Sequence, residues 1–241
     1  MKRIFLCLAV FLGACASSST VQMPRWYQYR EIETPKFTLA AWVKETSAQD
    51  PVHIYIEGDG RTHDVLGFPS ANPTPTSDLV RQMALDDKAS NVVYLARPCQ
   101  YVKDSICSKK DWTTARFSPY AVMSMALAIQ KIAKGRPVQI YAYSGGALIS
   151  GLIINNYPEI KVQHWTTFAG LLNHTSWTSY HQKEPLTGSL DLVQLPSVPQ
   201  THYAGQRDTV VPLALITEWT QNKNLIILPK ATHNGPFISE D

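Results

Sequence analysis

Short apolar runs rich in β-branched residues alternate with longer stretches of helical spacing along most of the chain. Most of these runs are apolar throughout, so we expect strands that are buried on both faces of a sheet. Strands that alternate with helices are typical of an α/β fold, with a mostly parallel central sheet and helices on both faces. The seven predicted strands are 37–43, 53–57, 91–96, 138–143, 164–170, 201–205 and 225–229.

Three helices are predicted between these strands. A Ser-Pro pair at 118–119 supplies an N-cap and a first-turn proline for a helical run that ends at Gly135. A second helix follows Ser144 and is apolar nearly all round, which predicts that it is buried. A third follows Pro212.

Two long stretches interrupt this alternation. Residues 58–80 are rich in Pro, Gly and Asp, and residues 171–200 separate the fifth and sixth predicted strands. Loops of this length in a compact domain are often functional. We expect 171–200 to form a small cap-like insertion.

The N-terminus has the pattern of an export signal. Lys2 and Arg3 precede an apolar run that is too short to span a membrane, and small residues follow it. The letters LGAC at 12–15 resemble the lipobox of bacterial lipoproteins. Residues 1–14 are therefore predicted to be a lipoprotein signal peptide, with a plain cleaved signal peptide as the alternative.

The lipobox resemblance implies that Cys15 is lipidated and becomes the mature N-terminus. Ala16 follows it, whereas the enteric pattern for retention in the inner membrane has aspartate there. This favours an anchor in the outer membrane, facing the periplasm. Residues 15–36 would then be the lipidated cysteine and a tether, and 37–241 a single domain.

Charge and composition exclude several classes of function. The chain has a formal net charge of +3, and loss of Lys2 and Arg3 reduces the 22 basic residues to 20, against 19 acidic ones. No basic run indicates nucleic acid, and no second long apolar segment indicates membrane contact beyond the lipid. Asp59, His63 and Asp64 form a sparse set whose spacing does not recur, so we predict no metal or cofactor. The oligomeric state is not indicated.

Two cysteines, Cys99 and Cys107, lie within the predicted domain in a polar stretch between a strand and a helix. In an exported protein they are expected to form a disulfide. A catalytic thiol is the alternative, but no histidine lies nearby in the sequence.

The stretch YAYSGGALIS at 141–150 passes from strand residues through Ser144 into helix formers. This is the context of the nucleophile elbow G-x-S-x-G, in which a sharp turn exposes a serine hydroxyl above a sheet. Gly146 fills the downstream position, and Ala142 stands where the upstream glycine is usual. The alternative is a glycine-rich turn with a solvent-exposed serine.

Two later residues complete a pattern. Asp208 follows the sixth predicted strand and His233 follows the seventh, so serine, acid and histidine occur in the chain order of an α/β-hydrolase. From about 37 to 238 the chain resembles the α/β-hydrolase fold family. The resemblance implies that Ser144 is the nucleophile, Asp208 the acid and His233 the base.

Each assignment has a structural alternative. Asp208 as a helix cap and His233 as a surface histidine are the simplest. Asp191 is a rival acid, but it lies before the sixth predicted strand, and His202 is a rival base, but it lies within a strand.

The resemblance also implies an oxyanion hole made of backbone N–H groups. One should come from Gly145, directly after the nucleophile. The other should come from the loop after the second predicted strand, where Asp59 is the first choice and Gly60 the second. Glu57 stands where relatives carry a histidine.

The inserted stretch 169–191 resembles a segment of uncharacterised α/β-hydrolase lipoproteins of Gram-negative bacteria, as does the run LARPCQY at 95–101. Residues after the fifth strand often build the cap of this fold. Trp177 and Tyr180 are therefore candidates for lining the substrate pocket, with packing inside the insertion as the equal alternative.

Arg61, Arg97 and Arg116 lie in loops near predicted strand ends. One of them could hold an anionic group of a substrate, or all could pair with neighbouring acids.

These features predict a lipid-anchored serine hydrolase that needs no cofactor. We expect a carboxylesterase that cleaves a small ester through an acyl-Ser144 intermediate. A serine peptidase or amidase on the same fold, and a non-catalytic binding protein of the envelope, are the alternatives.

Overall fold

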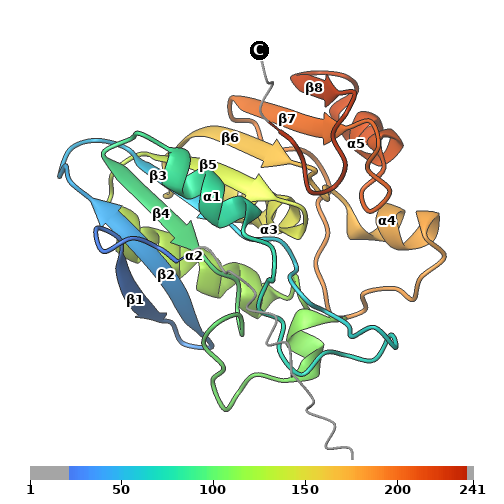
Figure 1. Cartoon of the computed structure of the whole chain (residues 1–241), viewed down its shortest axis with the longest axis horizontal. Helices are drawn as coiled ribbons and strands as arrows, with labels where there is room; N and C mark the ends of the chain where they lie inside the picture. Colours follow the sequence, from blue (N-terminus) through green and yellow to red (C-terminus); the bar gives the residue numbers. More distant parts are fainter. Residues whose placement is uncertain (1–21, 238–241) are drawn as a thin grey trace, which may run out of the picture.

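A central sheet of eight strands organises residues 22–237, the part of the chain that the computed structural model describes (Figure 1). The strand order is β1-β2-β4-β3-β5-β6-β7-β8. β1 and β2 are antiparallel, β2 and β4 are antiparallel, and all other neighbours are parallel. The strands are β1 Gln28–Glu33, β2 Thr38–Glu45, β3 Val52–Ile56, β4 Asn91–Leu95, β5 Val138–Tyr143, β6 Val162–Phe168, β7 Gln200–Gly205 and β8 Leu225–Leu228. The seven predicted strands and the mostly parallel sheet are confirmed.

The first strand, β1, was not predicted. It lies inside the expected tether 15–36 and pairs with β2, Glu31 opposite Ala40. Its sequence QYREIE has no apolar run because it is an edge strand with mostly exposed side chains. The folded domain therefore begins before residue 37. The predicted signal peptide and Cys15 lie outside the described residues.

Helices cover both faces of the sheet, as predicted (Figure 1). Successive strand residues point to opposite faces, so Ile54 and Ile56 pack in one core with α2 and α3, while Tyr55 packs in the other with α1. The helices are α1 Leu79–Asp86, α2 Pro119–Ala133, α3 Gly145–Asn156, α4 His174–Tyr180 and α5 Leu213–Thr220, with a 3₁₀ turn, η1, at Lys109–Trp112. None of the helices in the described part of the chain is long and apolar enough to cross a membrane.

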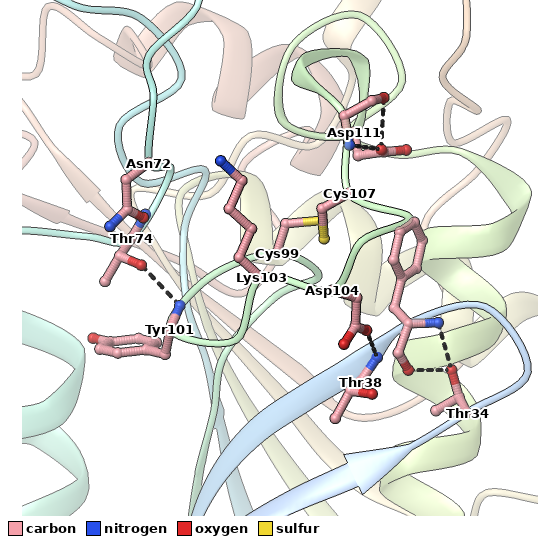
Figure 2. Close-up of a disulfide and its surroundings, with 12 residues drawn as sticks. Thr34, Thr38, Asn72, Thr74, Cys99, Tyr101, Lys103, Asp104, Cys107 and Asp111 are labelled. Carbon is pink, nitrogen blue, oxygen red and sulfur yellow. Dashed lines mark hydrogen bonds between the residues drawn. A yellow bond between two sulfur atoms is a disulfide. The ribbon is translucent and has the colours of Figure 1, made fainter.

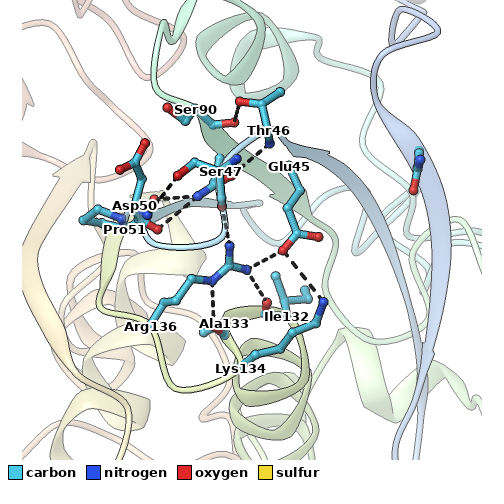
Figure 3. Close-up of polar contacts among 12 residues, drawn as sticks. Glu45, Thr46, Ser47, Asp50, Pro51, Ser90, Ile132, Ala133, Lys134 and Arg136 are labelled. Atoms are coloured by element: carbon cyan, nitrogen blue, oxygen red, sulfur yellow. Dashed lines mark hydrogen bonds and ion pairs between the residues drawn. The ribbon is translucent and has the colours of Figure 1, made fainter.

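Both ends of α2 have the signals that the sequence predicts. The Ser118 hydroxyl accepts a hydrogen bond from the N–H of Ala121 at 3.2 Å. At the other end the predicted Gly135 has a positive φ of 82°, and Lys134 before it has a φ of 53°. Arg136, which was not predicted, donates to a backbone oxygen of the last turn, Ala133 O, at 2.9 Å. The same guanidinium pairs with Glu45 at 2.6 Å, which ties the end of α2 to the end of β2 (Figure 3).

The loop after β4 is closed by the predicted disulfide, Cys99–Cys107, with 5.9 Å between the two Cα atoms (Figure 2). Asp104 accepts a hydrogen bond from Thr38 N at 2.6 Å, and Tyr101 N donates to Thr74 Oγ1 at 2.8 Å. These contacts hold the loop against β2 and against the long segment 58–78. Closing a loop of this size stabilises a fold by roughly 2–3 kcal/mol in the chain-entropy model.

The insertion 171–200 contains α4 and is otherwise irregular. Its second half runs along the segment that leads into α2, with Gly188 N bonded to Thr114 O at 3.2 Å and Leu190 N bonded to Phe117 O at 2.9 Å. The two segments therefore form one wall at the carboxyl edge of the parallel strands.

Candidate active site

Three side chains from three strand ends meet at this edge of the sheet. Ser144 follows β5, Asp208 follows β7 and His233 follows β8. The Nε2 atom of His233 lies 3.0 Å from Ser144 Oγ, and its Nδ1 atom lies 2.8 Å from Asp208 Oδ2. The structure thus brings together the three residues that the sequence singled out.

The Asp208 carboxylate is fixed on both oxygens. Its side chain has no exposed surface, and Oδ1 accepts hydrogen bonds from Val210 N at 2.8 Å and Val211 N at 2.9 Å. Oδ2 faces His233. The carboxylate therefore both orders the loop before α5 and faces the imidazole. It does not cap α5, whose N-cap residue is Pro212 and has no side-chain hydrogen bond.

Ser144 occupies a strained turn. Its backbone angles are φ 50° and ψ −123°, a conformation that costs a residue with a side chain of the order of 1–3 kcal/mol. The start of α3 lies close to the end of β3, because a Cβ on Gly146 would lie 2.6 Å from Glu57 O. This matches the elbow that the sequence predicts, and Ala142 is accommodated upstream as a fully buried residue.

The candidate oxyanion donors border the same site. α3 begins at Gly145, so its N–H has no partner within the helix. Among residues 22–237, no acceptor pairs with the N–H groups of Asp59, Gly60 or Gly145. Gly60 has a positive φ of 65°, and a side chain there would collide with Pro73 O. These N–H groups are free to bind an oxyanion, and that role stays a prediction.

The side chain of Asp59 has a separate function that the sequence did not reveal. Its carboxylate pairs with Arg97 and, at 2.8 Å, with Nε of Arg116. Burial raises the pKa of Asp59, but the two guanidinium charges outweigh burial and hold that pKa below its usual value. A side chain at Gly145 would collide with this carboxylate. The ion pairs thus tie the loop after β3 to the loop after β4 and to the segment before α2, and the carboxylate lies against the start of α3.

Glu57, directly after β3, is a buried acid beside this loop. Tyr94 donates its hydroxyl proton to Oε1 at 2.8 Å, and Gly58 N donates to Oε2 at 3.1 Å. Burial outweighs these bonds and raises the pKa of Glu57 to about 7. Near neutral pH this group is therefore only partly charged.

A cavity of about 740 Å³ opens next to Ser144 and His233. Its wall comes from the two long segments, 58–78 and 171–200, and from the segment before α2. The Trp177 indole is part of the wall and donates to Val210 O at 2.6 Å. Leu171, Leu186 and Val211 supply apolar surface. Trp177 was a candidate from the sequence, but the three apolar residues were not, because loop residues of this kind carry no periodic signal.

The prediction for Tyr180 was wrong. Its side chain is 56% exposed and does not line the cavity. Tyr180 is the last residue of α4, and its ring contacts His181 with 5.1 Å between centroids. The Val210 carbonyl, in contrast, holds Trp177 on the cavity side.

The rival residues take no part in this site. The carboxylate of Asp191 accepts hydrogen bonds from His174 N and Thr175 N, both at 2.9 Å. His202 is buried between Thr167 and Gln200, and burial lowers its pKa to about 4. Within the described chain, no group of three or more His, Cys, Asp or Glu residues is placed to hold a metal ion.

Of the three loop arginines, Arg97 has a guanidinium group whose contacts are all with other residues of the fold. It pairs with Asp59, donates to Arg116 O, and lies 4.7 Å from the Phe117 ring centroid. Arg61 and Arg116 both line the cavity.

The chain is similar to known proteins in structure, but no match was found from its sequence. No protein-family model matches the chain, and no curated protein sequence matches it. A structure described as an alpha-beta serine hydrolase homologue from Coxiella burnetii is similar over 89% of this chain and 91% of its own, with a TM-score of 0.57 and 15% identity. XC6422 from Xanthomonas campestris, described as an a/b serine hydrolase without lid, is similar over 89% of both chains, with a TM-score of 0.55 and 15% identity.

A third similar structure is Est1E from Butyrivibrio proteoclasticus with ferulic acid bound. The likeness covers 87% of this chain and 92% of that one, with a TM-score of 0.61 and 14% identity. These similarities extend over nearly the whole described domain and include its sheet. The chain therefore has the α/β-hydrolase fold.

Proposed function

We propose that the protein is a serine hydrolase that cleaves carboxylic esters through an acyl-Ser144 intermediate. The observation that supports this most directly is the position of His233, whose two ring nitrogens lie 3.0 Å from Ser144 Oγ and 2.8 Å from Asp208 Oδ2. These are the distances of a nucleophile, its base and the group that orients the base.

In the proposed mechanism, His233 Nε2 removes the hydroxyl proton as Ser144 Oγ attacks the ester carbonyl carbon. Asp208 keeps the imidazole in one tautomer and stabilises the imidazolium that forms. The N–H groups of Gly145 and Asp59 would bind the oxyanion of the tetrahedral intermediate. The intermediate then expels the alcohol, which takes the proton from His233.

The second half of the reaction repeats these roles with water. His233 removes a proton from the water that attacks the acyl carbon, and Ser144 leaves as its hydroxyl. No step of this acyl transfer calls for a cofactor. The cavity of about 740 Å³ beside Ser144 is large enough for a small substrate.

Labelling with a fluorophosphonate probe tests the proposal. The purified domain without Cys15 should react, because an activated serine attacks phosphorus. Ser144→Ala should not react, and Ser150→Ala is the matched control, since Ser150 lies buried in α3 at a distance from the cavity. If the folded protein neither labels nor hydrolyses a short p-nitrophenyl ester, the proposal is wrong and a binding function becomes the better one.

We further propose that a lipid on Cys15 anchors the protein to the outer membrane. The support is the LGAC motif after an apolar run. Cys15→Ser is expected to abolish incorporation of labelled palmitate and to move the protein from the membrane fraction to the soluble fraction. Cys7→Ser, within the apolar run, is the control. Unchanged membrane association of Cys15→Ser would contradict the anchor.

A further inference from the structure

The cavity beside Ser144 has three cationic side chains on its wall, Arg61, Arg116 and Lys183. Arg61 and Lys183 pair with no carboxylate in the described part of the chain. Arg116 has one acidic partner, Asp59, and shares it with Arg97. The proposed catalytic reaction uses none of the three directly, so their gathering at the cavity needs another explanation.

Trp177 brings two of these cations together. The guanidinium carbon of Arg116 lies 5.7 Å from the centroid of the Trp177 ring, and Lys183 Nζ lies 4.6 Å from the same centroid. An aromatic face stabilises a cation at such distances without neutralising it. The indole is itself fixed by its bond to Val210 O. The two charges are thereby held beside the cavity rather than left on flexible side chains.

Arg116 also has N–H groups that donate no hydrogen bond within the described residues. Its side chain is only 6% exposed. Its Nε faces Asp59 without hydrogen-bond alignment, and Nη1 donates to Thr113 O at 3.3 Å. Within residues 22–237 its Nη2 has no acceptor. Buried donors are normally satisfied, so a guanidinium beside a cavity with free N–H groups is suited to an anionic ligand.

Acids on the wall do not cancel this charge. Asp59 is shared between two arginines, Glu184 is exposed, and Glu57 is held partly protonated by burial. The charges of Arg116 and Lys183 also act on His63 on the cavity wall. Burial is the largest cause that lowers the pKa of His63, and these two charges lower it further. On the wall, the three cations Arg61, Arg116 and Lys183 therefore outnumber the two fully charged acids, Asp59 and Glu184.

We propose that the natural substrate is an ester that carries a carboxylate, which binds between Arg116 and Lys183 while the ester carbonyl lies at Ser144. This inference rests on the proposed function. It narrows the substrate from esters in general to anionic esters. It also explains why a cation-rich wall and an apolar wall share one cavity: the first binds the carboxylate, and Leu171 and Leu186 contact the carbon chain.

Two matched substrate pairs test the inference, one for each side of the scissile bond. Mono-p-nitrophenyl glutarate is compared with p-nitrophenyl pentanoate, and 4-acetoxybenzoate with its methyl ester. For each pair the ratio of kcat/KM, anionic over neutral, is divided by the same ratio for uncatalysed hydrolysis. In at least one pair, Lys183→Met is expected to lower this ratio about 10-fold relative to wild type, the lower end of electrostatic steering effects.

Lys161→Met is the matched control, because Lys161 is exposed and precedes β6 at the opposite edge of the sheet. It should leave both ratios unchanged. Added salt should lower the wild-type ratio more than that of Lys183→Met, since the variant has lost one of the charges that salt screens. Ratios that are the same in wild type and Lys183→Met for both pairs would overturn the inference while neutral-ester hydrolysis still supports the proposed function. Loss of hydrolysis and of labelling in wild type would contradict the proposed function itself.

Discussion

Replacing His233 with alanine is expected to lower kcat for ester hydrolysis by roughly 10⁶-fold, because Ser144 loses the only base within reach of its hydroxyl in the described structure. Residues that act as a unit are not additive, so adding Ser144→Ala to this variant should cause almost no further loss. Asp208→Asn should cost about 10⁴-fold, since it favours the wrong tautomer of the imidazole. Release of p-nitrophenol from a short ester measures these three variants and Ser144→Ala alone.

The control for this series is His164→Gln. His164 lies early in β6 and bonds to Thr201 Oγ1 at 3.0 Å, away from the cavity. Its kcat should match that of the wild type. The proposed roles would be wrong if His233→Ala kept more than about one hundredth of the wild-type kcat, or if the losses from His233→Ala and Ser144→Ala multiplied.

Replacing Asp59 with asparagine is expected to reduce the free energy of unfolding by about 3–5 kcal/mol. The substitution leaves two buried guanidinium groups, of Arg97 and Arg116, without their shared carboxylate, and removing one partner of a buried ion pair has this order of cost. Urea unfolding at neutral pH measures the loss. Asp86→Asn, at an exposed position of α1, should change stability by less than about 0.5 kcal/mol.

The pH dependence of this difference follows from the lowered pKa of Asp59. The unfolded chain takes up a proton near a pKa of about 3.9, whereas the folded chain resists it until a lower pH. The stability from Asp59 is therefore fully present above about pH 4 and is lost as pH falls through the folded pKa. The difference in the free energy of unfolding between wild type and Asp59→Asn should therefore become smaller as the pH is lowered. A gap that stayed constant or widened would show that the carboxylate charge is not what stabilises the loop.

The sheet and the three site residues could be predicted because their signals are local. The parallel strands are apolar runs, and most of them are buried. Ser144 follows β5 directly, and Asp208 and His233 lie in the loops after β7 and β8. A glycine-rich turn between strand and helix marks the serine further. The order of serine, acid and histidine along the chain then indicates which acid goes with which base, without any distance between their side chains.

The rest depends on contacts between distant segments. β1 escaped prediction because an exposed edge strand needs no apolar run, and α1 and α4 are too short to show a helical period. The Asp59 cluster joins three separate loops through Arg97 and Arg116. The sequence placed these residues near strand ends but could not show which of them meet.

The order of the strands also bears on how the protein is made. A ribosome delivers Ser144 and α3 first, then Asp208, and the imidazole of His233 only after β8 has been synthesised. If His233 is the base of Ser144, as proposed, an incomplete chain has the serine hydroxyl without its base and is expected to form no acyl adduct. Under the proposed mechanism, the serine becomes reactive only when β8 has paired with β7 at the edge of the sheet, so activity depends on completion of the fold.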